Sequence, residues 1–349
     1  MRAHGVFVGG THVQNAKTKE PFFSLDLVDA DLGGDADAES AGAARTRRIP
    51  LTFLAHGFTV RPGQPNVAAV FEKKGPGGAL VDLAEGTRLR AIDPLPGCAF
   101  YGHGQYGEGG DVLYCVESEL ATRRGLLTVR DATDFRVLEE VPTFGQSPHD
   151  CVFVDAHTLV VTNGGGPIDS SEPGCVTIVD VKARKLVERL DVTDGRINAG
   201  HLAVRDAGTF AVSSAPRDGL PATTSSGGVS FRWSGGAFAR ASAGDDVTAR
   251  MLGESLSVAL DRRSDVAVVT NPWGDLLTRW DAREARLLEA RSMEFVRGVA
   301  MTLDGAHFVL AHGKMPTLSL FTADGLRPVR SVATGVVSGS HVYVWAPPG

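Results

Sequence analysis

The sequence predicts an all-β chain that folds as a seven-bladed β-propeller, with residues 1–349 in a single domain. Two observations predict this fold: a four-strand unit recurs seven times, and the last unit is completed by residues from the start of the chain. A third observation agrees, because 42 glycines in 349 residues favour many tight turns between short strands. Helical periodicity is absent, so we expect no helix.

Each repeated unit begins with a polar residue after a short loop and continues through short apolar strands separated by Gly, Asp or Pro. Successive units start 47, 46, 52, 53, 43 and 44 residues apart. Repeats of about 40 to 50 residues with four strands each are typical of propeller blades, because one four-stranded sheet buries both faces only by stacking on its neighbours. The units start at His56, His103, His149, His201, Glu254, Arg297 and His341.

Within the units, strands are predicted from runs of four to eight residues rich in Val, Leu, Thr and Phe. Two units show all the later strands clearly. In the unit that starts at His56 these runs are residues 67–73, 78–83 and 88–93, and in the unit that starts at His149 they are residues 158–164, 175–181 and 185–192.

The last unit is incomplete, because only one strand follows His341. Residues 5–53 contain three further strands, at 5–12, 21–29 and 47–53. We therefore predict that the C-terminal strand joins these three N-terminal strands in one blade, which closes the ring and removes the exposed sheet edges that an open ring would leave. The stretches 29–47 and 215–228 fall outside the pattern and are predicted to be exposed loops.

Composition and charge exclude several classes of function. The net charge of −6 and the lack of a basic cluster argue against a nucleic-acid or anionic-membrane partner. No segment has the roughly 18 apolar residues of a membrane span, and residues 1–13 lack the apolar run of an export signal, so we expect a cytoplasmic protein. No phosphate-binding loop, hydrolase nucleophile motif or HExxH zinc motif occurs.

Several motifs resemble a bacterial family known as domain of unknown function fifteen-thirteen. The resemblance covers most of the chain, weakens from Glu254 onward, and is most specific around His103, His149 and Asn163. Members often carry an export signal and tend to be encoded near iron-uptake components, so the resemblance implies a role for metal but names no reaction. The motifs are RPGQPNVAAVF at 61–71, FYGHGQYGEGGDVLYCVES at 100–118, SPHD at 147–150, LVVTNGGG at 159–166 and GHLAV at 200–204.

Five of the ten histidines open predicted blades. Since the innermost strand of each blade lines the central channel, these imidazoles are expected together near one end of the axis. Imidazole nitrogens suit iron, copper, zinc or nickel. We predict one iron or copper ion, with iron preferred, in a layout like that of the four-histidine carotenoid-cleaving oxygenases, a likeness of arrangement alone. The predicted ligands are His56, His103, His149 and His201, and His341 either completes the set or lines the channel.

The other two opening residues, Glu254 and Arg297, come from neighbouring blades. They either pair with each other across the channel or act in catalysis, the carboxylate by orienting a ligand imidazole and the guanidinium by holding an anionic substrate. Cys151 is either a small buried apolar residue or a further ligand. No special role is expected for the histidines away from the opening positions, which are His4, His12, His157, His307 and His312.

These features predict a metal-dependent oxidoreductase that acts on a small-molecule substrate, with dioxygen as a candidate co-substrate. Two alternatives stay open. In one, the chain is a non-catalytic scaffold that binds a protein partner, and its axial histidines make structural hydrogen bonds like the Gly-His pairs of WD-type propellers. In the other, the chain handles a metal without turning over a substrate.

Overall fold

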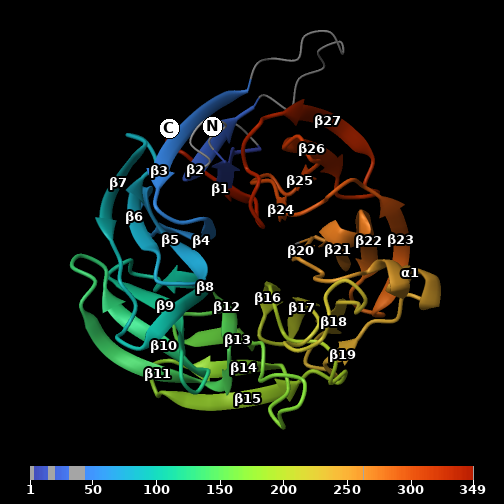
Figure 1. Ribbon diagram of the computed structural model, residues 1–349, viewed down its shortest axis with the longest axis horizontal. Helices are drawn as coiled ribbons and strands as arrows, with labels where there is room; N and C mark the ends of the chain where they lie inside the picture. The colour runs from blue at the N-terminus through green and yellow to red at the C-terminus, as the bar shows by residue number, and fades with distance from the viewer. Residues whose placement is uncertain (1–3, 15–19, 31–43, 262, 349) are drawn as a thin grey trace.

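The computed structural model describes residues 4–14, 20–30, 44–261 and 263–348. Figure 1 shows the chain passing once around a central axis, with its β-sheets arranged radially. Every pairing between consecutive strands of these sheets is antiparallel. The predicted all-β class is confirmed.

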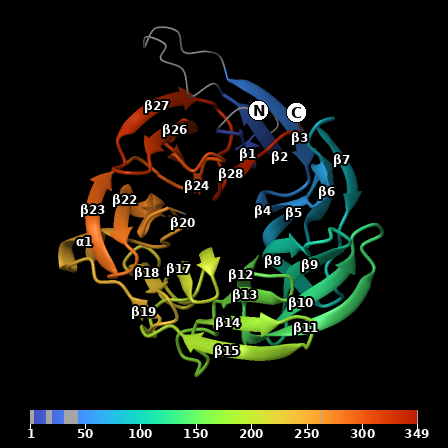
Figure 2. The same ribbon diagram turned by 180° about the vertical axis from the view of Figure 1, so that it is seen from behind.

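The two ends of the chain share one sheet. Strand β28 (Tyr343–Trp345) pairs with β1 (Val6–Gln14), which continues through β2 (Pro21–Asp29) to β3 (Arg45–Leu51). Val6 lies opposite Trp345, and Val8 lies opposite Tyr343. Figure 2 shows β28 on the inner side of this sheet, next to β1. Most of the loop predicted between β2 and β3 lies outside the described residues.

The next sheet has eight strands in two halves. Strands β5 and β8 join the halves, with Lys73 opposite Tyr101 and Gly75 opposite Phe100. The first half comprises β4 (Ala55–Arg61), β5 (Gln64–Gly75), β6 (Gly78–Asp82) and β7 (Thr87–Ala91), and the second comprises β8 (Cys98–Tyr106), β9 (Val112–Glu119), β10 (Arg124–Asp131) and β11 (Val137–Gln146).

Four more sheets follow in sequence order, each with four consecutive strands. In each of them the first strand lies nearest the axis and the fourth lies outermost (Figures 1 and 2). The first of these sheets comprises β12 (Pro148–Phe153), β13 (Thr158–Asn163), β14 (Cys175–Asp180) and β15 (Lys185–Asp191), and the second comprises β16 (Leu202–Asp206), β17 (Thr209–Ser214), β18 (Gly228–Arg232) and β19 (Ala239–Arg240). The third comprises β20 (Ser257–Leu260), β21 (Val266–Asn271), β22 (Leu276–Asp281) and β23 (Arg286–Ser292). The fourth comprises β24 (Val299–Met301), β25 (His307–His312), β26 (Thr317–Thr322) and β27 (Pro328–Ala333).

The described residues include a three-residue 3-10 helix, Pro272–Gly274, and one short α-helix, α1 (Asp245–Arg250), which departs from the expectation of no helix. Acidic residues in its first turn and Arg250 in its last turn complement the helix dipole. Val247 and Met251 pack into the apolar cluster that contains Trp280. Six residues are too few to show helical periodicity in the sequence, which explains why the pattern missed α1.

The apolar core lies between neighbouring sheets. In one such layer, Val8 and Leu27 of the first sheet pack with Val70 and Val81 of the next sheet. Strands in the middle of the sheets are buried on both faces, whereas outer strands such as β7 are exposed. Because each sheet relies on its neighbours for burial, the stacking of sheets positions the inner strands around the axis.

Candidate metal centre

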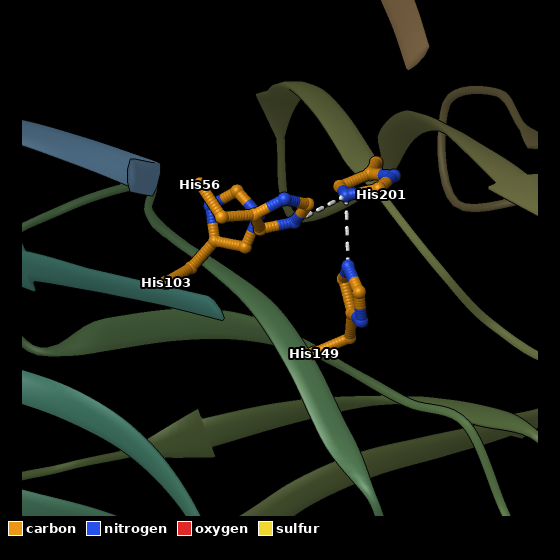
Figure 3. Close-up of side chains that lie close together, drawn as sticks. All are labelled: His56, His103, His149 and His201. Carbon is orange, nitrogen blue, oxygen red and sulfur yellow. Dashed lines mark hydrogen bonds between the residues drawn. The ribbon is translucent and has the colours of Figure 1, made fainter. Parts of the chain in front are cut away.

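Five histidines that lie in or just before the innermost strands come together in one cluster. His56 lies in β4, His103 in β8 and His149 in β12, while His201 immediately precedes β16 and His341 lies two residues before β28. All five residues are buried. Figure 3 shows four of these side chains close together, with dashed lines that join His201 to His56 and to His149. The structure therefore brings the predicted histidines together, including His341.

Register shifts in the inner strands determine where three of these rings point. The pairing of β4 with β5 shifts at His56, that of β8 with β9 shifts between Phe100 and Gly104, and that of β12 with β13 shifts between Pro148 and Cys151. Such bulges redirect side chains and are frequent beside functional sites.

Two glycines allow His56 and His103 to approach each other. Gly102 has a φ of +127°, and a Cβ there would lie 2.6 Å from His56 Cδ2. A Cβ on Gly57 would lie 2.1 Å from the carbonyl oxygen of Gly102. The imidazole rings of His56 and His103 consequently pack edge to face, with centroids 4.9 Å apart.

Nε2 of His201 is the centre of the cluster. It lies 3.1 Å from Nε2 of His56, 2.8 Å from Nε2 of His149 and 2.8 Å from Nε2 of His341. An imidazole nitrogen carries either one proton or one lone pair, so it cannot satisfy three such neighbours by ordinary hydrogen bonds. Two nitrogens bound to one ion at about 2.1 Å lie about 3.0 Å apart at right angles and about 3.4 Å apart in a tetrahedron. The observed distances of 2.8, 2.8 and 3.1 Å lie near the right-angle value and below the tetrahedral one, so they favour nitrogens that share one ion at angles close to 90°.

His103 belongs to the same cluster, and Asp150 contacts its other ring nitrogen. One ligand nitrogen from each of His56, His103, His149 and His201 lies within 4.8 Å of the others. Nδ1 of His103 lies 3.4 Å from Oδ1 of Asp150, and Nε2 of His103 is buried without a hydrogen-bond partner in the described part of the chain. A carboxylate at Nδ1 favours the tautomer with a free lone pair on Nε2, which is the form that binds a metal.

The protein environment keeps these imidazoles neutral. Burial lowers the pKa of His56, His149, His201 and His341 well below the usual value, and repulsion from neighbouring histidines and from Lys73 acts in the same direction. Burial also lowers the pKa of His103, against the opposing effect of Asp150. Because a metal must displace protons from its ligands, neutral imidazoles are ready to bind.

Two cavities border the histidine cluster. The mouth cavity has a volume of about 150 Å³ and is lined by residues that include Lys73, Tyr101, His149 and Glu254. The channel cavity has a volume of about 430 Å³ and is lined by residues from every inner strand, together with His103, His201 and His341. The histidine cluster thus borders two separate cavities.

Glu254 and Arg297 form no ion pair with each other in the described structure, so of the two alternatives the one in which they pair across the channel is not supported. Glu254 Oε1 instead accepts a hydrogen bond of 3.0 Å from Lys73 Nζ, and both residues line the mouth cavity. Arg297 donates to the carbonyl oxygens of Phe295 and Gly313, on the loops beside its own strand. Lys73 lies far from Glu254 in the sequence and was not predicted.

Cys151 lies in an apolar layer between sheets with residues such as Val116 and Val161. Burial raises the pKa of its thiol well above the usual range. A protonated thiol in an apolar layer is a poor metal ligand.

Asp150, the last residue of the SPHD motif and the neighbour of His149, was not predicted from the sequence as a site residue. The sequence did contain one indication of this role, because Asp150 is a carboxylate that directly follows the predicted ligand His149.

The chain matches a protein family in sequence and resembles a solved structure in fold. A family model described as "Protein of unknown function (DUF1513)" matches residues 49–336. The chain is similar in structure to a chain described as "Kuenenia stuttgartiensis Hydrazine Synthase", with a TM-score of 0.64 and 13% sequence identity over 88% of this chain and 93% of that one. At this identity the likeness concerns the fold alone. No curated protein matches the sequence. Among the described residues, no helix has the length and apolar character needed to cross a membrane.

Proposed function

This chain belongs to the DUF1513 family, whose function is unknown, and we propose from the site that it is a metal-dependent oxidoreductase. An iron or copper ion, with iron preferred, would be held by the axial histidines. The observation that carries the proposal is the convergence of three Nε2 atoms within 3.1 Å of Nε2 of His201. The ligand set comprises His56, His103, His149, His201 and His341.

The proposal includes a finer description of the fold. We take β4–β7 and β8–β11 as two separate blades, so that the chain is one seven-bladed propeller in a single domain, closed by β28 and β1. The two-point contact between β5 and β8 supports this division, because it is much shorter than the pairing within either half. The pairing of Val6 with Trp345 supports the closure.

The donor set fits a redox-active metal. Neutral imidazoles leave the charge of a divalent ion uncompensated, and an iron or copper ion bound there would supply electron transfer and Lewis-acid activation of a bound substrate. Asp150 would fix the orientation of His103 by its contact with Nδ1. Lys73 Nζ and Glu254 Oε1, which face the mouth cavity with His149, would hold or move a proton there.

The two cavities suggest how reactants reach the centre. The channel cavity, at about 430 Å³, has the size of a small-molecule site and adjoins three of the histidines. The mouth cavity, at about 150 Å³, has room for a diatomic molecule or a small anion beside His149. We propose that an organic substrate occupies the channel cavity and that dioxygen or another small reactant enters through the mouth cavity.

The first test of this proposal asks whether the bound ion has an open coordination position. Protein loaded with Cu(II) is titrated with azide, and protein loaded with Fe(II) is exposed to nitric oxide. We expect a new absorption band with azide and a new electron paramagnetic resonance signal with nitric oxide, because an ion that uses an exogenous reactant must keep a free position.

A matched variant distinguishes the histidines that hold the metal from residues that only line the nearby cavity. Glu254→Gln should keep its metal and its azide band, since Glu254 contacts Lys73 and not an imidazole nitrogen. If the metal is bound but ignores both azide and nitric oxide, the oxidoreductase proposal fails, and a metal-handling protein without turnover takes its place.

A further inference from the structure

A second group of metal-binding side chains lies away from the histidine cluster. The expectation that His4 and His307 have no special role does not anticipate this group, because the structure gathers them with Asp304 so that one ligand atom from each lies within 4.8 Å of the others. The rings of His4 and His307 are 5.0 Å apart at 77°. His4 Nδ1 lies 3.3 Å from Asp304 Oδ2.

The turn between β24 and β25 orients the carboxylate. Oδ1 of Asp304 accepts hydrogen bonds from Thr302 Oγ1 at 2.6 Å and from the backbone N–H of Ala306 at 2.9 Å. These bonds leave Oδ2 directed toward His4. The carboxylate is therefore fixed on one side and open to a ligand on the other.

The imidazoles of this group have unused nitrogen atoms. Nδ1 of His307 is buried and makes no hydrogen bond within the described residues, and Nδ1 of His4 is buried with only the carboxylate of Asp304 nearby, at 3.3 Å and without the geometry of a hydrogen bond. A buried polar atom without a partner is costly and is rare in native proteins. A cation bound between the rings and the carboxylate would supply the missing interaction.

The backbone holds the two parts of this group close together. Gly5 follows His4, and a Cβ at Gly5 would lie 2.6 Å from Val344 Cγ1 and 2.8 Å from Leu303 Cδ1. The segment before β1 thus packs directly on the β24–β25 turn and on β28. His4 lies two residues before β1, in the segment that leads into the first sheet. Asp304 lies in the β24–β25 turn and His307 begins β25, so both belong to the neighbouring sheet.

We propose that His4, Asp304 and His307 bind a divalent transition-metal ion that fastens the start of β1 to the β24–β25 turn. Two imidazole nitrogens and one carboxylate oxygen are a ligand set used for zinc and for non-haem iron. The side chains of His4 and Asp304 are 18% and 28% exposed, so the ion retains access to water. Its role is to stabilise the contact between two sheets, and it does not depend on the function proposed for the axial histidines.

Zinc alone is the probe for the test. The full-length protein is stripped of metal, and amide hydrogen exchange of residues 5–8 is measured with and without Zn²⁺. An ion that binds only while the start of β1 is packed on the β24–β25 turn slows exchange by the factor 1 + [Zn²⁺]/Kd, which is about tenfold at a free zinc concentration ten times its Kd. We expect this protection in the wild type and its loss in His4→Ala and in His307→Ala. Each of these variants should also bind one zinc fewer per chain in equilibrium dialysis.

The matched control is His157→Ala. His157 lies in the equivalent turn between β12 and β13, where Asp155 accepts backbone hydrogen bonds, and His157 is exposed. This variant should keep the zinc-dependent protection of residues 5–8. Equal protection and zinc content in all three variants, or no protection in the wild type, would overturn the proposal. Neither outcome affects the axial centre, because none of the substituted residues touches it.

Discussion

At the scale of single residues, the candidate centre depends on imidazoles that are held neutral and on one carboxylate that orients them. Asp150 is buried at the edge of the channel cavity, and its oxygens accept backbone N–H groups of Cys151 at 2.8 Å and Leu202 at 3.0 Å. These bonds tie the carboxylate to the strand of His149 and to the residue that follows His201. Asp150 thus links three of the proposed ligands, because it also lies beside His103.

Asp150→Asn should weaken metal binding without removing a ligand. The amide NH₂ would replace Oδ2 and face the N–H of Leu202, so two donors would oppose each other. We expect metal affinity to fall by about 10- to 100-fold, as is typical when an orienting partner of a ligand is lost. The free energy of unfolding should fall by about 1–3 kcal/mol. Competition with a chelator and urea unfolding measure the two effects.

Asp155→Asn provides the control for this prediction. Asp155 also accepts two backbone N–H groups, from His157 and Thr158, but it lies in an exposed turn away from the cluster. Metal affinity should be unchanged in this variant. Similar metal affinities for the two variants would show that Asp150 does not act on the ligands.

At the scale of strands, the positions of individual strands could be predicted from the sequence, because they depend on the local pattern of residues. The predicted runs at 67–73 and 158–164 overlap β5 (Gln64–Gly75) and β13 (Thr158–Asn163), because β-branched residues and turn residues mark strands and their ends. The bulges at His56, His103 and His149 could not be predicted, since a register shift is a property of two paired strands and not of either one. The orientation of these three imidazole rings could therefore not be predicted from the sequence.

Gly102→Ala tests whether strand packing positions His56. Alanine at a φ of +127° is strained, and its Cβ would also press on the ring of His56 at 2.6 Å. We expect about 1–3 kcal/mol of destabilisation from the backbone strain. We also expect at least about a tenfold loss of metal affinity, from the displaced ring. Thermal unfolding and chelator competition measure these quantities.

Gly97→Ala separates backbone strain from the displacement of the ring. Gly97 also has a positive φ, of +79°, but a Cβ there would meet nothing within 4 Å. This variant should lose some stability and keep its metal affinity. If Gly102→Ala binds metal as well as Gly97→Ala does, close packing of β4 on β8 is not needed for the site.

At the scale of the whole molecule, the ring gathers residues that are far apart in the sequence. The proposed ligands extend from His56 to His341, and no local segment contains more than one of them. Their meeting was predictable because a repeat places equivalent residues at equivalent positions around an axis. Contacts outside the repeat were not predictable, and the pairing of Lys73 with Glu254 and the approach of His4 to His307 are examples.

The central claim is that the axial histidines share one metal ion, and the iron and copper content of three proteins tests it most directly. The wild type, His201→Ala and His157→Ala are purified without a histidine tag, loaded with Fe(II) or Cu(II), desalted and analysed for metal. Nε2 of His201 lies within 3.1 Å of three other imidazole nitrogens, whereas His157 is exposed in a turn. We predict that His157→Ala retains as much iron or copper as the wild type and that His201→Ala loses about one ion per chain. Equal metal content in the two folded variants would contradict a shared axial ion and leave the five histidines with a structural role.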